Sequence, residues 1–337
     1  MRFGWNATAY QLVNPGIDLW FSELGDAVVG SVTKNRVRVI AGAPVCAMER
    51  LAEVVNEYTD HSPRRTCYFG AAGRLWDLLR MQADYQSVVL GAQPIWNPQT
   101  WSPERIPSLR QQFNRARNKG VFVEEWTSEQ ATGHPDLRRV LQEWLTTRGL
   151  PPLHFLVEPE TLAFLEDRRV FVAIRADRVV GFLVLSPIPM RKGWLTEQFI
   201  RGAGAPNGTV ELLVDSAVRA VAKDGAEYVT LGLVPLSDFP TGSGSDPNPL
   251  WLRILAKWTR AHGRRFYNFV GLEAFKAKFR PDHWEPIYVV SHERKFSFRT
   301  LYAVAAAFTH IPPWLALLRG MVKALRQEIG WLFRGRR

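Results

Sequence analysis

The sequence contains only two cysteines among its 337 residues, Cys46 and Cys67, and both lie in apolar or strand-like surroundings. A small scaffold held together by disulfides is therefore excluded, and both residues are predicted to be buried thiols in a reducing compartment. No Cys-x-x-Cys or His-Glu-x-x-His motif occurs, and the seven histidines are scattered. A metal site is therefore not expected.

Long apolar runs are also missing. No stretch of about 18 apolar residues occurs, because His310, Pro312 and Pro313 interrupt the nearest candidate, residues 301–318. Residues 1–10 are mixed and polar, which is unlike a signal peptide. The sequence therefore predicts a cytoplasmic protein whose only membrane contact would be peripheral, on the inner face of the cytoplasmic membrane.

The formal net charge of +11 is concentrated in two segments. Residues 294–337 contain nine Lys or Arg and one acid, and residues 105–119 contain five Lys or Arg and no acid, so the rest of the chain is close to neutral. Such blocks are expected to face polyanions or an anionic membrane. Arg outnumbers Lys 34 to 9, which suits phosphate contacts, although a GC-rich genome produces the same bias.

The hydrophobic pattern predicts an α/β fold in which short strands and helices alternate twice along the chain. In the first half, strands at 27–33 and 36–41 are predicted to be joined by a turn at Lys34-Asn35, and a loop is predicted at 94–103. In the second half, a helix is predicted at 159–165. The strands at 170–175, 179–187 and 193–201 are predicted to be antiparallel, with the first two joined at Asp177, and a helix at 209–223 leads to a parallel strand at 228–233. A mixed sheet with helices on both faces is therefore expected in each half.

The repeated order of elements divides the chain into two related α/β domains. Ile106, Leu109, Phe113 and Ala116 recur at helical spacing and predict a basic connecting helix that ends at Gly120. The expected parts are an N-terminal domain (1–104), the connecting helix (105–120), a C-terminal domain (121–295) and a basic tail (296–337).

The densest polar cluster lies on the strand 193–201 and the helix that follows it. On a regular strand Glu197, Phe199 and Arg201 share one face. A Gly-rich turn then leads into a helix whose N-terminus can hold a phosphate or carboxylate. Glu211 and Asp215 lie one turn apart on that helix, where acids also serve simply as partners of the helix dipole.

A second cluster is the segment 275–281, Phe-Lys-Ala-Lys-Phe-Arg-Pro. If this segment is extended, the alternation of aromatic and basic residues places Lys276 and Lys278 on the same side. The alternative is a solvated basic edge.

Five motifs in the same order resemble the cytosolic catalytic domain of bacterial lysyl- or aminoacyl-phosphatidylglycerol synthases, also called phosphatidylglycerol lysyltransferases or multiple peptide resistance factors. The similarity covers most of residues 1–295 and is strongest from 105 to 290. The motifs are Arg110–Gly120 (RQQFNRARNKG), Gly181-Phe182 with Pro187, Gly208 with Glu211-Leu212-Leu213, Leu231–Ser237 (LGLVPLS), and Phe275–Pro281 with Trp284-Glu285-Pro286.

The resemblance implies two tandem acetyltransferase-like (GNAT) folds joined by a long helix. It also implies transfer of an aminoacyl group from aminoacyl-tRNA to a hydroxyl of phosphatidylglycerol, with no cofactor beyond the tRNA co-substrate. The best-known members carry a flippase domain before the catalytic part. The sequence has none, so the resemblance implies a stand-alone synthase domain with a separate flippase as a possible partner.

The resemblance also assigns candidate roles. Glu197 and Glu211 fall at or near acidic positions of the family and would hold an amine or move a proton. Lys276 matches the first base of the family's FK-x-KF-like segment and would meet a phosphate or the oxyanion. Further substrate-binding candidates are Arg201, Asp215, Lys278, Arg115 and Arg117, the last two for tRNA on the basic helix. The helix reads Val-Glu-Leu-Leu where relatives often have Met-Asp-x-Leu, so the amino acid transferred is not fixed by the resemblance.

Two other functions remain open from the sequence. One is a CoA-dependent N-acyltransferase, whose phosphate loop Arg201–Pro206 matches only in part, because Pro206 removes an N–H donor. The other is a non-catalytic module that binds lipid.

The tail has the pattern of an interfacial helix. From Trp314 to Arg334, apolar residues fall on one side at helical spacing and basic residues on the other. The segment 299–337 is therefore predicted to be a separable membrane anchor, and a C-terminal helix docked on the second domain is the alternative.

Overall fold

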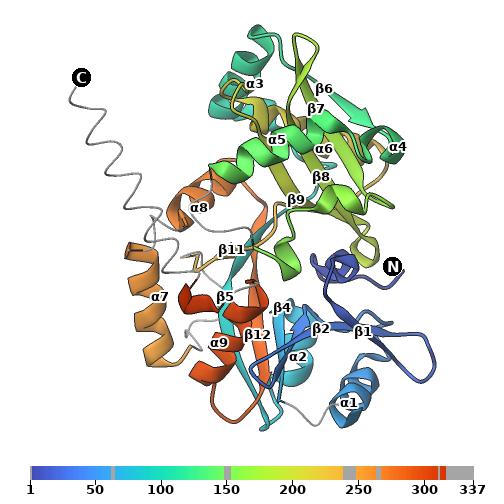
Figure 1. Cartoon of the computed structure of the whole chain (residues 1–337), viewed down its shortest axis with the longest axis vertical. Helices are drawn as coiled ribbons and strands as arrows, with labels where there is room; N and C mark the ends of the chain where they lie inside the picture. Colours follow the sequence, from blue (N-terminus) through green and yellow to red (C-terminus); the bar gives the residue numbers. More distant parts are fainter. Residues whose placement is uncertain are drawn as a thin grey trace.

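The computed structural model describes residues 2–61, 65–147, 153–237, 248–262, 267–309 and 312–315. The described residues of the first half contribute five strands, two α-helices and one 3-10 helix to the lower part of the molecule (Figure 1). They are η1 (Ala9–Val13), β1 (Asp18–Phe21), β2 (Val28–Lys34), β3 (Val37–Ala41), α1 (Leu51–His61), β4 (Arg65–Ala71), α2 (Gly73–Leu79) and β5 (Tyr85–Trp96).

The remaining elements form the upper part and then return to the lower one (Figure 1). They are η2 (Pro103–Arg105), α3 (Pro107–Asn118), β6 (Phe122–Trp126), α4 (Ser128–Ala131), α5 (Pro135–Thr146), η3 (Phe155–Val157), η4 (Thr161–Ala163), β7 (Arg169–Arg175), β8 (Arg178–Ile188), η5 (Pro189–Arg191), β9 (Gly193–Arg201), α6 (Thr209–Lys223), β10 (Tyr228–Thr230), β11 (Val234–Pro235), α7 (Leu250–His262), α8 (Phe269–Ala277), β12 (His283–His292) and α9 (Phe298–Ala307).

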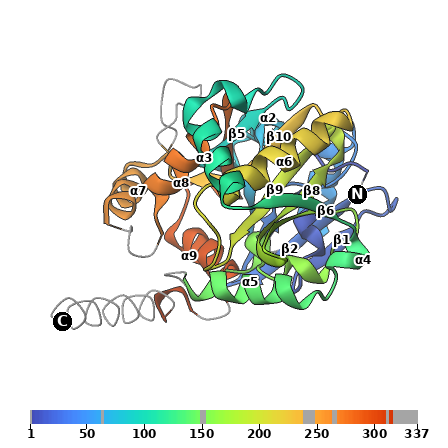
Figure 2. The same cartoon turned by 90° about the horizontal axis from the view of Figure 1, so that it is seen from above.

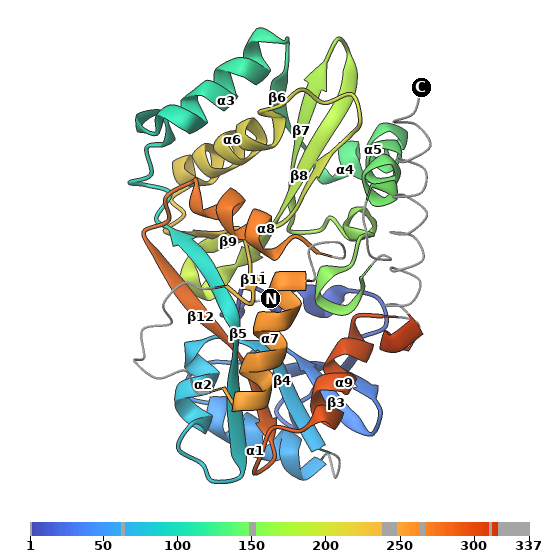
Figure 3. The same ribbon diagram turned by 90° about the vertical axis from the view of Figure 1, so that its left-hand side faces the viewer.

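The strands of the described residues form one mixed sheet rather than two separate ones. Their order is β1-β2-β3-β4-β12-β5-β10-β9-β8-β7-β6, and β11 pairs with β5. The two halves meet where β10 pairs with the end of β5, through Val229 with Trp96 and Thr230 with Ile95. Figure 3 shows the long strands β5 and β12 running from the lower part into the upper one. The predicted mixed α/β architecture is confirmed, with its two sheets continuous.

The strand β12 ties the end of the chain to its beginning. It pairs antiparallel with β4 on one side and, over ten residue pairs from His283 with Ile95 to His292 with Tyr85, with β5 on the other. Residues 283–292 therefore belong to the sheet of the first half, although the predicted C-terminal domain included them. The predicted boundaries of the four parts stay predictions.

Alternation along the strands of the first half builds a core on each face of the sheet. Val37, Val39 and Ala41 point into one cluster with α9, while Ile40 points into the other with α1 and α2. The two predicted hairpins are confirmed. Their turns are Asn35-Arg36 and Ala176-Asp177, and both residues of each turn have positive φ. The two cysteines are free and buried, as predicted.

The basic helix α3 packs along α6 instead of spanning the two halves. Its apolar stripe of Leu109, Phe113 and Ala116 is buried in the same cluster as Leu212 and Leu213 of α6. Figure 2 shows α3 and α6 side by side. The backbone of α3 lies close to Gly208, the residue before α6, since a Cβ at Gly208 would lie 2.1 Å from the backbone oxygen of Gln112. The φ of +94° at Gly208 also favours glycine.

Two expectations for local structure are wrong, and the condition considered for residues 275–281 is not met. The strand β5 continues through Pro94 to Trp96, where a loop was expected, because Pro94 lies opposite Trp284 and the strand is held by β12. The helix expected at 159–165 is only the short turn η4. The segment at 275–281 is not extended, because α8 continues to Ala277 with Lys278 as its C-cap.

The tail is not separable from residue 299 onward. In α9, Thr300, Ala303, Val304 and Ala307 are buried against the first half of the sheet. The following Phe308 packs its ring 5.0 Å from Phe69 and 5.4 Å from Phe155. The amphipathic helix expected from Trp314 to Arg334 lies outside the described residues after Leu315. No helix among the described residues is long and apolar enough to span a bilayer.

A chain ending at Ser297 is expected to be far less stable than one ending at Thr309. Loss of α9 and Phe308 uncovers several buried apolar side chains, which costs on the order of 5 kcal/mol and lowers Tm by roughly 10 °C or more. Thermal unfolding followed by circular dichroism measures the difference. Equal Tm values for the two truncated chains would contradict the assignment of α9 to the core.

Candidate active site

The candidate site lies where β9 and β10 diverge. These strands are parallel, and β10 pairs with only the first three residues of β9, Gly193 to Leu195. Further along β9, Phe199 stacks on Phe275 of α8, with ring centroids 5.2 Å apart. The helix α6 begins at Thr209, directly after β9 and its loop. Carboxyl ends of parallel strands beside a helix N-terminus are the usual ligand position in α/β folds.

Lys276 is buried at this point, with only 4% of its surface exposed. Its Nζ donates to the carbonyl oxygens of Leu231, Gly232 (2.8 Å) and Leu233 (3.1 Å), which follow β10. Burial lowers the pKa of Lys276 to about 7. An ammonium has three protons for these three acceptors, and its neutral form has a lone pair. Near neutral pH the charged and the neutral form of this side chain are therefore both present.

Glu211 of α6 and Lys278 at the end of α8 form an ion pair. Glu211 is in the first turn of α6, where the helix dipole favours a carboxylate, and its Oε1 contacts Nζ of Lys278. The same ammonium lies 4.2 Å from the ring centroid of Phe275 and 5.6 Å from that of Phe279. The structure therefore brings together Glu211 and Lys278, two of the residues predicted from the sequence, while Lys276 of the same helix meets the carbonyls that follow β10.

Aromatic side chains fix the end of α8. The indole N–H groups of Trp96 and Trp101 both donate to the carbonyl of Phe279, at 3.1 and 3.3 Å. A small apolar cavity lies behind them, lined by Trp96, Trp101, Val214, Val218, Val229, Leu231 and Phe279. Because α8 is helical, Lys276 and Lys278 meet different partners, whereas an extended segment would have placed them together.

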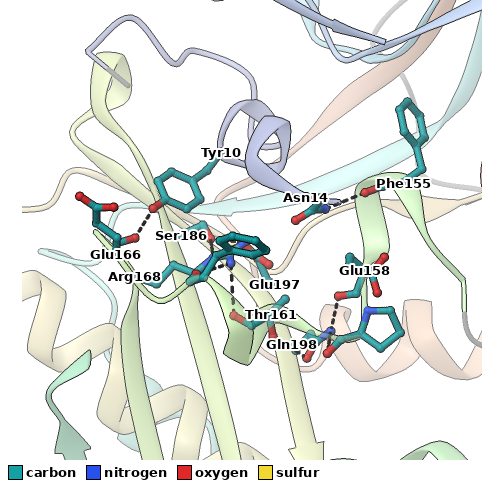
Figure 4. Close-up of polar contacts among 12 residues, drawn as sticks. Tyr10, Asn14, Phe155, Glu158, Thr161, Glu166, Arg168, Ser186, Glu197 and Gln198 are labelled. Atoms are coloured by element: carbon teal, nitrogen blue, oxygen red, sulfur yellow. Dashed lines mark hydrogen bonds and ion pairs between the residues drawn. The ribbon is translucent and has the colours of Figure 1, made fainter. Parts of the chain in front are cut away.

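Glu197 lies in a separate cluster, drawn in Figure 4. Arg168 has no exposed side-chain surface, and its Nε and Nη2 donate to Oε1 of Glu197 at 3.0 and 2.8 Å. Ser186 also donates to this carboxylate, and the Tyr10 ring lies 5.0 Å from the guanidinium. Burial raises the pKa of Glu197, and the charge of Arg168 opposes this.

The expectation that Glu197 and Phe199 share one face is wrong. The register of β8 with β9 shifts so that Val184 pairs with Gln198 and Leu185 with Thr196, which leaves Glu197 as the extra residue of a β-bulge. A bulge breaks the alternation of side chains. Glu197 therefore turns toward Arg168, while Phe199 faces α8.

The other predicted residues lie at the edges of the site. Asp215 is buried and pairs with Arg219 (2.8 Å) and Arg117 (3.6 Å); burial raises its pKa and Arg219 opposes this. Arg201 donates to the carbonyl of Ala205 and to Asn207, and so braces the loop before α6. Arg115 is exposed on α3.

Two groups of polar residues were not predicted from the sequence. Arg168 stands in a charged run before β7, and nothing in the pattern distinguishes it from its exposed neighbours. A second network joins the two halves: Arg191 pairs with Glu285 through two hydrogen bonds of 2.8 and 2.6 Å, and Gln93 and Tyr228 also donate to Glu285. Of these four residues, only Glu285 belonged to one of the five sequence motifs.

Within the described ranges, no group of three or more His, Cys, Asp or Glu is arranged to hold a metal ion.

Comparison with known proteins identifies the type of domain. Residues 2–291 match the family model described as "Phosphatidylglycerol lysyltransferase, C-terminal". The phosphatidylglycerol lysyltransferase of Bacillus subtilis (strain 168) is 22% identical over 298 residues, which is 85% of this chain and 33% of that protein. The chain thus matches about a third of the length of this relative.

Solved structures show the same fold. The C-terminal domain of a putative lysylphosphatidylglycerol synthetase from Agrobacterium fabrum has a TM-score of 0.76 at 22% identity, over 90% of this chain and 93% of that one. L-PGS from Bacillus licheniformis has a TM-score of 0.74 at 19% identity, over 90% and 91%. FemX follows with 0.53 at 10% identity, over 88% and 97%. The fold class that the resemblance implied is confirmed.

Stability is expected to rise with pH because of Lys276. The folded protein releases the proton near pH 7, whereas the unfolded chain holds it to about 10.4, so between these values unfolding takes up a proton. Relative to Lys276→Met, the free energy of unfolding should therefore rise by roughly 1 kcal/mol per pH unit from pH 7.5 to 9.5. Urea denaturation at several pH values measures this difference. A difference that does not change with pH would show that the folded pKa is not lowered.

Proposed function

Because the chain belongs to the phosphatidylglycerol lysyltransferase C-terminal family, we propose that it transfers an aminoacyl group, lysyl or similar, from aminoacyl-tRNA to a hydroxyl of phosphatidylglycerol or a related lipid. The observation that carries the proposal is the buried amine of Lys276 at the end of β10, on the same helix whose end carries Lys278 in its ion pair with Glu211. Lys276 supplies an amine whose pKa is about 7, and the ion pair supplies a carboxylate and an ammonium.

The reaction is an exchange of esters. The lipid hydroxyl oxygen bonds to the aminoacyl carbonyl carbon, and the bond from that carbon to the ribose oxygen of the tRNA breaks. The proton of the lipid hydroxyl is removed, and the ribose oxygen receives one. Since the starting ester is already activated, no ATP or other cofactor is required. The site must orient the two substrates, move this proton and stabilise the oxyanion.

We assign each of these tasks to a charged residue of the site. Lys276, whose pKa is about 7, is assigned the proton or the oxyanion. Glu211 is assigned the ammonium of the aminoacyl group, because its partner Lys278 is partly exposed and can move aside to a lipid phosphate. Glu197 is less suited to this task, since the fully buried Arg168 already holds its carboxylate. We assign Glu197 and Arg168 to positioning β9.

We assign the binding of aminoacyl-tRNA to the basic face of α3. Arg110, Arg115 and Arg117 are exposed on this helix, which packs on α6 near the start of that helix. Phosphates of a tRNA acceptor arm along α3 would bring its aminoacyl end toward Glu211. The carbonyl of Gln112 lies close to Gly208 at the start of α6, which leaves less room there for the pyrophosphate of CoA than an open helix N-terminus would.

Lys276→Ala is expected to lower the rate of lipid aminoacylation at least about 100-fold, because removal of a proton-transfer or oxyanion group has effects of this size. Glu211→Gln should raise KM for the aminoacyl-tRNA. The assay combines charged tRNA with phosphatidylglycerol and detects a new ninhydrin-positive phospholipid by thin-layer chromatography.

The matched control for Lys276→Ala is Lys223→Ala, at an exposed lysine on the far end of α6, which should keep the wild-type rate. Full activity of Lys276→Ala would refute the assigned role. Saturable thermal stabilisation by acetyl-CoA, with no lipid product from any charged tRNA, would favour an N-acyltransferase instead.

The role of α3 can be tested by charge reversal. Arg110→Glu with Arg115→Glu should weaken the use of aminoacyl-tRNA, with an effect that shrinks as salt is raised, since phosphate contacts release counterions. Arg117 is left intact because it pairs with Asp215. The control, Lys34→Glu with Arg138→Glu, changes the net charge equally on other elements. Equal KM values for the two double variants would argue against tRNA binding on α3.

A further inference from the structure

The outer faces of α7 and α9 carry a row of large apolar side chains. On α7, Leu250, Ile254 and Trp258 recur every fourth residue and are 69%, 61% and 61% exposed. On α9, Phe298 and Tyr302 are 67% and 39% exposed. Trp251 joins the two helices, since its ring lies 4.1 Å from that of Phe298. These five exposed residues, Leu250, Ile254, Trp258, Phe298 and Tyr302, are called the α7–α9 surface.

This surface is not the side on which the helices are attached. The inner sides of α7 and α9 already meet the core, where Trp251, Leu252 and Leu301 pack with buried residues of the first half. Figure 3 shows α7 and α9 next to each other on one side of the molecule, with α8 at the upper end of α7. Several large apolar residues gathered on one face typically mark a site of interaction with another surface.

Basic residues flank this surface, and the neighbouring acids Glu273 and Glu293 pair with Arg260 and Arg65. The helix α7 contains Arg253, Lys257 and Arg260 and no acid, and residues 294–302 contain Arg294, Lys295 and Arg299 and no acid. Arg260 pairs with Glu273, while Arg253, Lys257, Arg294, Lys295 and Arg299 are exposed. An apolar row that includes Trp, flanked by basic residues, is the composition of helices that lie in a membrane interface.

We propose that the α7–α9 surface docks on an anionic phospholipid bilayer; this rests on the proposed function, whose acceptor is a lipid of such a bilayer. A second copy of the chain is a poorer occupant, because a symmetric contact would set the same basic residues opposite each other. The surface is also linked to the candidate site. Arg260 of α7 holds Glu273 of α8 through two hydrogen bonds of 3.0 and 3.1 Å, one helical turn before Lys276.

The test must report on α7 itself, because the basic residues after Leu315 also attract anionic vesicles. Both native cysteines are fully buried, so a cysteine introduced at Ile254 can be labelled selectively in the full chain with the fluorophore NBD. Addition of vesicles of equal parts phosphatidylglycerol and phosphatidylcholine should shift its emission to shorter wavelength. The same label at Glu129→Cys, on α4 at the opposite side of the molecule in Figure 1, should not shift.

Affinity is measured by flotation with the same vesicles. Leu250→Glu with Ile254→Glu should weaken binding roughly thirtyfold or more, since two acids are brought to the anionic surface in place of two apolar side chains. The control, Leu24→Glu with Met81→Glu, places the same charge change at two other exposed apolar residues, which are 71% and 84% exposed. It should bind like wild type.

Three results would overturn the proposal. The first is an unchanged label at residue 254 on protein that floats with the vesicles. The second is equal affinity of the two double variants for the vesicles. The third is a shift of that label with protein concentration alone, which would make the surface an interface between copies.

Failure of the proposed function would look different. If no lipid product forms but the label at 254 shifts, the docking surface stands and the transferase proposal fails. If wild type transfers the aminoacyl group but the label does not shift, the transferase proposal stands and the docking proposal fails. With both correct, Leu250→Glu/Ile254→Glu keeps the wild-type rate on phosphatidylglycerol in detergent micelles and loses it on vesicles.

Discussion

The pairing of β12 with β5 is the interaction on which the candidate site depends. The helix α8, which carries Lys276, ends only a few residues before β12 begins. The ten residue pairs between β12 and β5 fix the start of β12 beside Ile95, where the N–H of Asp282 donates to the Ile95 carbonyl at 2.9 Å. The side chain of Asp282 accepts from the N–H of Asn97 at 2.7 Å. Strand pairing in the first half therefore positions a helix against the second.

Burial then gives the positioned side chains their chemistry. An exposed lysine is fully charged at neutral pH, and Lys276 differs because its ammonium is enclosed and meets only carbonyl oxygens. Glu211 differs from an ordinary acid at a helix start because Lys278 lies against it between two phenylalanine rings. The same residue types occur many times in the sequence, and their chemistry here comes from the partners that the fold gives Lys276 and Lys278.

The elements that could be predicted are those with local signals. The hairpin at Asp177, the helix 209–223 and the strand 193–201 follow from periodicity and turn residues, and the structure confirms them. The bulge at Glu197, the burial of Arg168 and the insertion of β12 between β4 and β5 depend on contacts between distant residues, which periodicity does not reveal. For the same reason Glu211, Lys276 and Lys278 could be identified as candidates, while the pairing of Lys278 with Glu211 and the carbonyls that hold Lys276 could not.

The continuous sheet also limits how this molecule can move. Many enzymes with two similar halves close on their substrates by rotation about a flexible connection. Here β5 and β12 run side by side through the middle of the molecule, and β5 pairs directly with β10 of the other half. A rotation between the halves would break these backbone hydrogen bonds and the Arg191–Glu285 pair. Under the proposed function, the two large substrates would therefore reach a scaffold that does not rotate between its halves, and entry to the site would depend on side chains and loops.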